Sequence, residues 1–230
     1  MKKGLIKRII LMVIGVALIG VGSGCLRTSR LGLDPFGCMV QGTSDLTGLS
    51  YGNTQLVINA VLLVLMIFKD RWSIGAGTLI NMVGVGYVSD GVVWLRDNVF
   101  HLNVEGFWQS IALLLGMGIL ALGVALYMTP ALGTAPYDDV AVIIENASRQ
   151  RIKFHYARII SDVTCVVIGV TVTLLAGYSV FRAVGIGTVA IAFLTGPLIQ
   201  FFRKFVALPL LKNTVIVEKR RPEKSKNENE

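Results

Sequence analysis

Charged side chains are scarce in this sequence, and that scarcity excludes an ordinary soluble domain. Only 16% of the 230 residues are charged and 53% are hydrophobic, whereas a soluble domain averages about 25% charged residues. The charges also cluster, which leaves long stretches with almost none. Because one soluble core cannot bury so many apolar side chains, we expect the lipid bilayer to be part of the solvent of this chain.

Histidine and cysteine are also rare, and their spacing does not support metal chemistry. The two histidines, His101 and His155, lie 54 positions apart without companion ligands. The three cysteines, Cys25, Cys38 and Cys165, lack metal-type spacing, and their odd number leaves at least one unpaired. The sequence also contains no serine–histidine–acid set and no nucleotide-binding loop. We therefore expect no enzyme, no catalytic residues, no metal site and no cofactor.

The net charge of +8 is distributed in a way that argues against a nucleic-acid partner. Basic residues crowd both termini and two short loops instead of forming a stripe on one face. With both termini in the cytoplasm, 17 Lys and Arg residues lie on the inner side and four on the outer side. That bias follows the positive-inside rule. It predicts a multi-pass protein of the bacterial inner (plasma) membrane, with both termini cytoplasmic.

Six apolar stretches are long enough to cross the hydrocarbon region, which needs about 20 residues of helix. We therefore expect an all-α membrane protein with six transmembrane helices. These spans are predicted at about 9–27, 53–68, 73–95, 107–128, 156–176 and 182–202.

The chain also contains an internal repeat. TSRLGLDPF at 28–36 matches TPALGTAPY at 129–137 with an offset of 101, and GAGT at 75–78 matches GIGT at 185–188 with an offset of 110. Each half then has three spans. Because three is odd, the second half must enter the membrane from the opposite side, which predicts two inverted-topology repeats. We place these repeats at 1–103 and 104–206, followed by a basic, mostly disordered cytoplasmic tail at 207–230.

The Gly/Pro breaks in the two halves predict one short extra helix each. Asp34 can cap a helix that begins at Pro35, and Pro136 can start the corresponding helix of the second half. We expect these helices at about 35–47 and 136–147. Their free N–H groups could hold an anionic or polar solute. The alternative is a pair of interfacial helices that merely cover a loop.

Charged groups inside spans need a reason, because each costs roughly 2.5 to 3.5 kcal/mol on insertion scales. Asp162 lies within the fifth span, with Arg158 one turn earlier as a potential ion-pair partner. An offset of 103 places Asn59 at the position equivalent to Asp162. Solute or proton handling and a structural ion pair are both open interpretations of these residues.

Other polar residues of the spans suggest packing or contact with water. We expect Asp90 to meet water near the outer end of the third span. We expect Arg27 and Arg30 to cap the first span, to reach toward the headgroups or to pair with Asp34. The GxGT glycines favour close helix contact, and their threonines favour bonds to the backbone.

Several stretches resemble the YczE/YyaS/YitT family of bacterial integral membrane proteins, and the YczE branch in particular. They are LGLDPF, GLSYGNTQLVIN, GAGTLINMVGVGYVSD, LGTAPYD, ARIISDV and GIGTVAIAFLTGPLIQFF, and they extend over about residues 8–206. The resemblance implies a bacterial plasma-membrane protein but no substrate.

The architecture predicts a small-solute transporter or permease, with an unknown solute bound between the two repeats. The alternative is a non-transporting accessory or scaffold subunit of a cell-envelope or biosynthetic complex. A homodimer or another membrane protein is then the partner besides the bilayer. The predicted substrate-binding residues are Asn59, Asp162, Arg158, Asp34, Pro35, Gly133, Pro136, Thr78 and Thr188.

Overall fold

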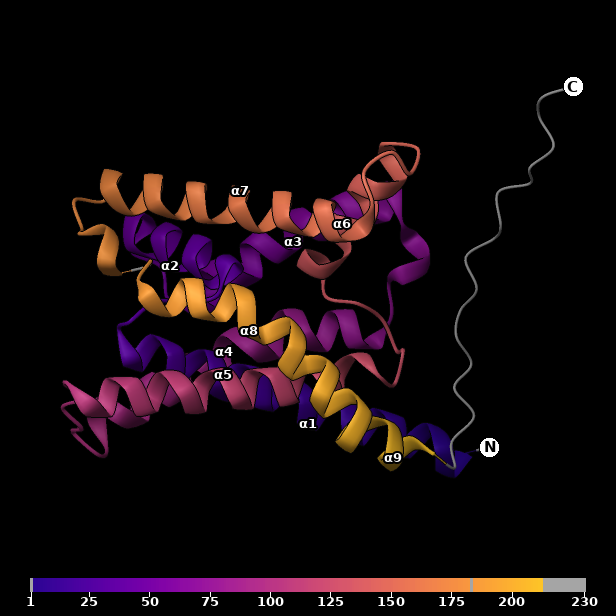
Figure 1. The fold of residues 1–230 in the computed structure, drawn as a ribbon, viewed down its shortest axis with the longest axis horizontal. Coiled ribbons are helices and arrows are strands. Elements are labelled where there is room, and N and C mark those ends of the chain that lie inside the picture. The colour runs from indigo at the N-terminus through magenta and orange to yellow at the C-terminus, as the bar shows by residue number, and fades with distance from the viewer. Residues whose placement is uncertain (1, 183, 213–230) are drawn as a thin grey trace, which may run out of the picture.

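The computed structural model describes residues 2–182 and 184–212, and these residues form helices without any strand (Figure 1). Two 3-10 turns, Arg71–Ser73 and Val180–Arg182, connect helices. A π-helical segment, Arg203–Ala207, joins the last two helices. The helices are α1 Lys2–Ser29, α2 Pro35–Thr47, α3 Tyr51–Lys69, α4 Ala76–Asn98, α5 Phe107–Met128, α6 Pro136–Ala147, α7 Phe154–Leu175, α8 Ile186–Phe202 and α9 Leu208–Leu211.

Within residues 2–182 and 184–212, six helices are long and apolar enough to cross a membrane, as predicted. The last of these runs continuously from α8 to Leu211, beyond residue 206, where the second repeat was expected to end. Most of the predicted tail, 213–230, lies outside the described residues. The short helices α2 and α6 have the predicted bounds, because proline occupies the first turn of each.

The third helix of each half starts later than predicted, at Ala76 and at Ile186. The glycine before each helix is extended, and a threonine hydroxyl caps it. The Gly75 N–H donates to Thr78 Oγ1 at 3.1 Å, and the Gly185 N–H donates to Thr188 Oγ1 at 3.3 Å. These caps fix both helix starts within the GxGT motifs.

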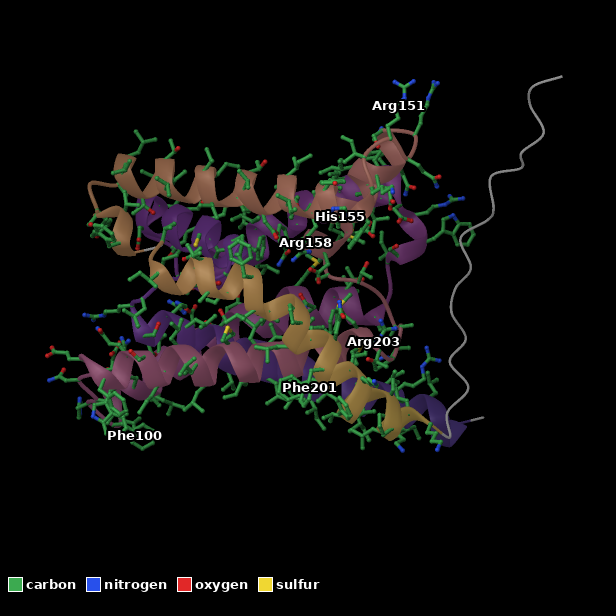
Figure 2. All side chains as sticks on the ribbon, in the orientation of Figure 1. Phe100, Arg151, His155, Arg158, Phe201 and Arg203 are labelled. Carbon is green, nitrogen blue, oxygen red and sulfur yellow. The ribbon has the colours of Figure 1, made fainter. Side chains whose placement is uncertain are left out.

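The long helices run along one axis of the molecule, and the first described turn of α1 lies at the same end as α9 (Figure 1). An even number of crossings returns the chain to its starting side. Apolar side chains such as Phe68 and Phe193 are exposed around the flank. Figure 2 shows Phe201 on this flank and Arg151 at the end where the first turn of α1 and α9 lie. This distribution matches an apolar belt in lipid with charges at its ends.

Helices α1 and α5 cross closely at glycines. A Cβ atom at Gly22 would lie 2.6 Å from the Leu120 backbone N, and one at Gly123 would lie 2.6 Å from the Ile19 backbone N. Real Cβ atoms do not tolerate such distances, so only glycine permits this crossing. Gly22 and Gly123 are separated by the repeat offset of 101.

Each LGxxP break is bound by the GxGT segment of the other half. The Gly187 N–H donates to the Leu31 carbonyl at 2.9 Å, and the Gly77 N–H donates to the Leu132 carbonyl at 3.0 Å. The glycine after each leucine has a φ of 128° or 126°, a conformation that glycine adopts without strain. The two contacts therefore connect the halves reciprocally.

Candidate functional site

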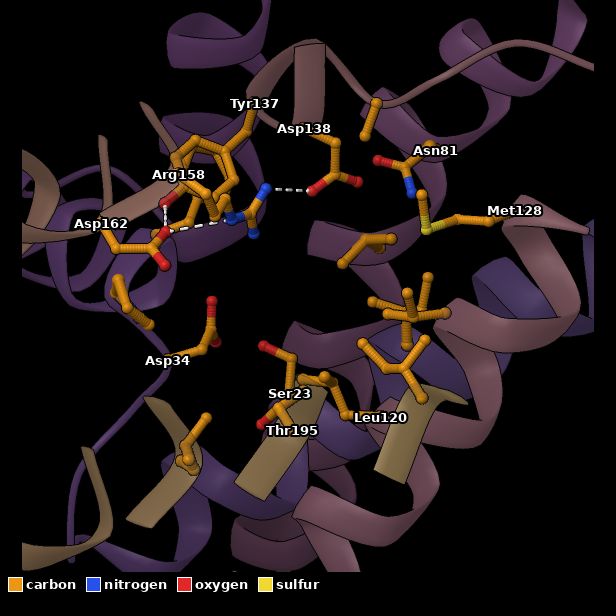
Figure 3. A pocket seen from close by; sticks show the side chains of 18 of the residues that line it. Ser23, Asp34, Asn81, Leu120, Met128, Tyr137, Asp138, Arg158, Asp162 and Thr195 are labelled. Carbon is orange, nitrogen blue, oxygen red and sulfur yellow. Dashed lines mark hydrogen bonds and ion pairs between the residues drawn. The ribbon is translucent and has the colours of Figure 1, made fainter. Parts of the chain in front are cut away.

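A cavity of about 410 Å³ lies between the two halves, and all eight helices from α1 to α8 contribute to its wall (Figure 3). Cavities of this size hold small organic ligands in many proteins. No three His, Cys, Asp or Glu side chains in the described part of the chain are grouped to hold a metal ion. Polar and charged side chains face the cavity from both halves, so it differs from an ordinary packing defect.

Arg158 on α7 joins two carboxylates at the cavity. Its Nη1 lies 2.8 Å from Asp138 Oδ1 and its Nε lies 3.3 Å from Asp162 Oδ1. The Tyr137 hydroxyl donates a hydrogen bond to the same Asp162 oxygen, and the guanidinium lies 4.6 Å from the centre of the Tyr137 ring. Figure 3 shows this group on one side of the cavity. The predicted ion pair of Arg158 with Asp162 is confirmed. Asp138 adds a second ion pair to Arg158, and Tyr137 adds a hydrogen bond to Asp162.

Asp34 borders the cavity at the start of α2. One of its carboxylate oxygens accepts the Gly37 N–H at 3.1 Å, which is the cap that the sequence predicts. Burial raises the pKa of the Asp34 carboxyl; the Asp162 charge adds to that increase and the Arg158 charge opposes it. Figure 3 shows the Asp34 side chain directed into the space below Arg158 and Asp162.

Three amide side chains line the cavity although they are almost fully buried. Asn59 is 1% exposed, Gln55 is 3% exposed and Asn81 is 6% exposed. The Oε1 atom of Gln55 accepts no hydrogen bond from the described residues. Buried polar groups are nearly always paired. The Gln55 amide oxygen thus remains available to a molecule in the cavity.

The two short helices begin next to each other at this cavity. The ring of Phe36, at the start of α2, stacks on the ring of Tyr137, at the start of α6, with centroids 4.6 Å apart and planes 20° from parallel. Pro35 also lies on the wall. The two helices therefore do not merely cover a loop at the membrane interface.

Five predicted site residues line the cavity: Asn59, Asp162, Arg158, Asp34 and Pro35. The structure does not bring the other four to the wall. Thr78 and Thr188 are buried caps of the third helices, and Thr78 also donates to the Thr134 carbonyl at 2.8 Å. Gly133 packs against Gly75, whose backbone N would lie 2.8 Å from a Cβ there. Pro136 starts α6 between two lining residues.

A second ion pair lies beside the cavity, toward the end of the molecule away from the described termini. Arg27 Nη1 lies 2.8 Å from Asp90 Oδ1 and 3.2 Å from Ser89 Oγ. Its guanidinium lies 4.2 Å from the centre of the Tyr51 ring, and Asp90 accepts the Gly52 N–H at 2.8 Å. We call Arg27, Tyr51, Ser89 and Asp90 the arginine cluster.

The arginine cluster corrects one prediction, because Arg27 pairs with Asp90 instead of Asp34. Asp90 also accepts the Gly52 N–H, while its side chain stays 25% exposed. Ser23, at 3.4 Å from both the Tyr51 hydroxyl and Ser89 Oγ, connects the cluster to the cavity wall. The one signal in the sequence was that Arg27 and Asp90 stand near the same end of their spans.

Comparisons with known proteins give a family without an assigned activity. The chain is 28% identical to an uncharacterized protein of Haemophilus influenzae, over 87% of this chain and 85% of the relative. It is 25% identical to the uncharacterized protein YyaS of Bacillus subtilis, over 84% and 90%. It is 24% identical to the uncharacterized membrane protein YczE of Bacillus subtilis, over 87% of each chain. No solved structure matches the chain.

These relatives confirm the resemblance to YczE and YyaS that the sequence motifs predicted. The model of a family of unknown function, DUF6198, matches residues 6–204. That match includes all the residues that line the cavity and nearly all of the helical part of the chain. The chain belongs to this family of bacterial membrane proteins.

Proposed function

We propose that this protein is a small-solute transporter of the bacterial plasma membrane that works by alternating access through the central cavity. The observation that carries the proposal is a polar, charged cavity lined by every helix from α1 to α8. Charged groups at this depth cost several kcal/mol, so in membrane proteins they mark solute or ion pathways. The proposal includes no catalytic step.

The proposal includes an inverted repeat, which alternating access commonly uses. The paired breaks and the paired glycines, each separated by 101 residues, support it. Phe36 and Tyr137 are equivalent under that offset and stack on each other. When equivalent residues contact each other, a two-fold axis passes between them. This axis crosses the cavity, where a transporter of this type holds its solute.

We also propose that both termini are cytoplasmic. The described termini and the basic loop that contains Arg149, Arg151 and Lys153 lie at one end of the molecule (Figures 1 and 2). Reporter domains fused to the two termini are expected to show cytoplasmic activity, because positive loops stay inside. Reporters on opposite faces would contradict both the topology and the six crossings.

Residues at equivalent positions of the two halves are packed together at one end of the cavity and exposed at the other. This difference supports an inward-open conformation. Arg27, Tyr51 and Ser89 of the arginine cluster correspond to Met128, Phe154 and Ile199 at offsets of 101, 103 and 110. The first set is joined by contacts, and Tyr51 is 3% exposed. The second set lines the cavity, and Met128 and Phe154 are 45% and 46% exposed. The arginine cluster would then close the outer end.

Replacing Asp162 with asparagine is expected to lower transport about tenfold or more. The variant removes the charge that Arg158 and Tyr137 contact, while Asp138 still pairs with Arg158 and preserves the fold. Counterflow in proteoliposomes measures the effect with a labelled panel of sugars, amino acids, amines and carboxylates. A tenfold loss is about 1.4 kcal/mol, a modest value for a charged contact.

The control is Asp97→Asn, which removes an exposed carboxylate paired with Arg96 away from the cavity. It is expected to keep wild-type transport. Equal transport by folded Asp162→Asn would remove Asp162 from the mechanism. If no solute of the panel exchanges and one membrane protein copurifies in a fixed ratio, the accessory-subunit function replaces transport.

A further inference from the structure

The charges on the cavity wall are unequal in number. The charged lining residues are three acids, Asp34, Asp138 and Asp162, and one base, Arg158. Arg158 is already engaged by Asp138 and Asp162. In the part of the chain that the structure describes, no Lys or Arg forms an ion pair with Asp34. The cavity therefore has a carboxyl group whose counter-ion is not supplied by these residues.

A second, independent observation also points to a ligand at this place. Gln55 is more than nine-tenths buried, lines the cavity and carries an amide oxygen, Oε1, that the described residues leave without a hydrogen bond. The Thr195 hydroxyl on α8 also lines the cavity without a partner among these residues. Amide oxygens and hydroxyl oxygens accept hydrogen bonds from an ammonium or hydroxyl group. The polar groups are therefore already arranged for such a solute.

The remainder of the wall fits an organic molecule better than a bare ion. Ile19, Leu120, Val124 and Ile191 face the same cavity as Asp34. A volume of about 410 Å³ is much larger than one metal ion needs. The transfer of alkyl groups from water to such an apolar surface lowers the free energy. The combination is an acidic group with polar and apolar neighbours.

We infer that the cavity binds a small organic cation, such as a protonated or quaternary amine, with Asp34 as its counter-ion. This inference rests on the proposed transport function for its role and names the class of solute. It replaces the anionic solute that the free helix N-termini suggested. At α2 the Asp34 carboxylate itself occupies the cap, and near α6 Asp138 and Asp162 would repel an anion.

Binding of such a cation is expected to depend on pH through Asp34. Because burial raises the pKa of this carboxyl, a proton competes with the cation, and a permanently charged cation binds more tightly as the pH rises through that pKa. The ionisable groups that face Asp34 from the elements packed around it are Cys38, Tyr51, Tyr137, Asp138, Arg158, Asp162 and Cys165.

The probes are choline with its neutral isostere 3,3-dimethylbutanol, the quaternary cation tetramethylammonium, and ethanolamine, a protonated amine with N–H donors. Binding is measured on the purified full chain in detergent, by thermal stabilisation and calorimetry. We expect the cations to bind at least tenfold more tightly than the neutral isostere, with tighter binding at higher pH. Asp34→Asn is expected to weaken cation binding at least tenfold and to remove its pH dependence. Asparagine still caps α2, so the fold is preserved.

Two further measurements distinguish a role of Asp34 from a general loss of folding. Asp97→Asn is expected to bind like the wild type, and the pH profile of the wild type tests Asp34 without any substitution. The inference is overturned if no cation stabilises the wild type more than the neutral isostere, or if Asp34→Asn binds cations equally well. Counterflow of a different solute class would then leave transport intact. Cation binding without counterflow would instead overturn transport alone.

Discussion

Replacing Gly123 with alanine is expected to lower the free energy of unfolding by about 1 to 3 kcal/mol. The added Cβ would lie 2.6 Å from the Ile19 backbone N and 2.8 Å from the Gly15 carbonyl. Both neighbours are backbone, so the helices α1 and α5 must separate along their crossing. Thermal unfolding of the purified protein in detergent measures the loss. Gly22→Ala should cause a similar loss, because its Cβ would meet the backbone of Leu120 at 2.6 Å.

The matched control for this prediction lies on the same helix. A Cβ at Gly118 meets nothing within 4 Å, so Gly118→Ala gains helix propensity without a clash. That variant is expected to be neutral or up to about 1 kcal/mol more stable. If Gly123→Ala and Gly118→Ala have the same stability, the close crossing of α1 and α5 is wrong. A loss at Gly123 without one at Gly22 would weaken the inverted repeat.

The helices were predictable because their signals are local. Each span is visible in the sequence as an apolar run. Proline in the first turn indicates where α2 and α6 begin. The helix starts at Ala76 and Ile186 were predicted a few residues early. Apolar content alone does not reveal that a threonine caps each preceding glycine. Those caps depend on side-chain bonds that hydropathy does not measure.

The candidate site was predictable only in part, because its contacts join distant segments. Asp162 and Arg158 were apparent since charges within an apolar run are conspicuous. Asp138 was not among the predicted site residues, but its Oδ1 lies 2.8 Å from Nη1 of Arg158, twenty positions away. Tyr51 gave no signal of its own, because it lies just outside a predicted span, where polar residues also occur at the boundary with water.

The GxGT motifs show why a shared pattern misleads about function. Thr78 and Thr188 were among the predicted binding residues, although the sequence also favoured bonds from these threonines to the backbone. In the structure both cap helices, and each contacts the other half, Thr78 through the Thr134 carbonyl and Thr188 through Cys38 Sγ. The proposed repeat has these packing threonines in both halves, whereas the charged cavity residue Asp34 corresponds to the uncharged Ala135 at the offset of 101.

Breaking the ion pair of Arg27 with Asp90 is expected to open the outer end of the cavity. Arg27→Gln removes a contact at 2.8 Å and the ring contact with Tyr51, and Asp90→Asn removes the same ion pair from α4. A cysteine at Ser23, in a chain without its three native cysteines, reports access from outside. We expect an impermeant maleimide to label it about tenfold faster in either variant, because about 1.4 kcal/mol changes a population ratio tenfold.

The control variant changes a different ion pair at the same end of the molecule as the arginine cluster. Arg96→Gln breaks an exposed ion pair with Asp97 at the same end of the molecule, and labelling of Ser23→Cys is expected to stay slow there. Faster labelling in both cluster variants but not in Arg96→Gln would mean that a specific contact holds the outer end closed. Slow labelling in folded Arg27→Gln and Asp90→Asn alike would show that the cluster is only structural. Alternating access would then need a different outer closure, because Tyr51 and Ser89 would remain packed without the guanidinium between them.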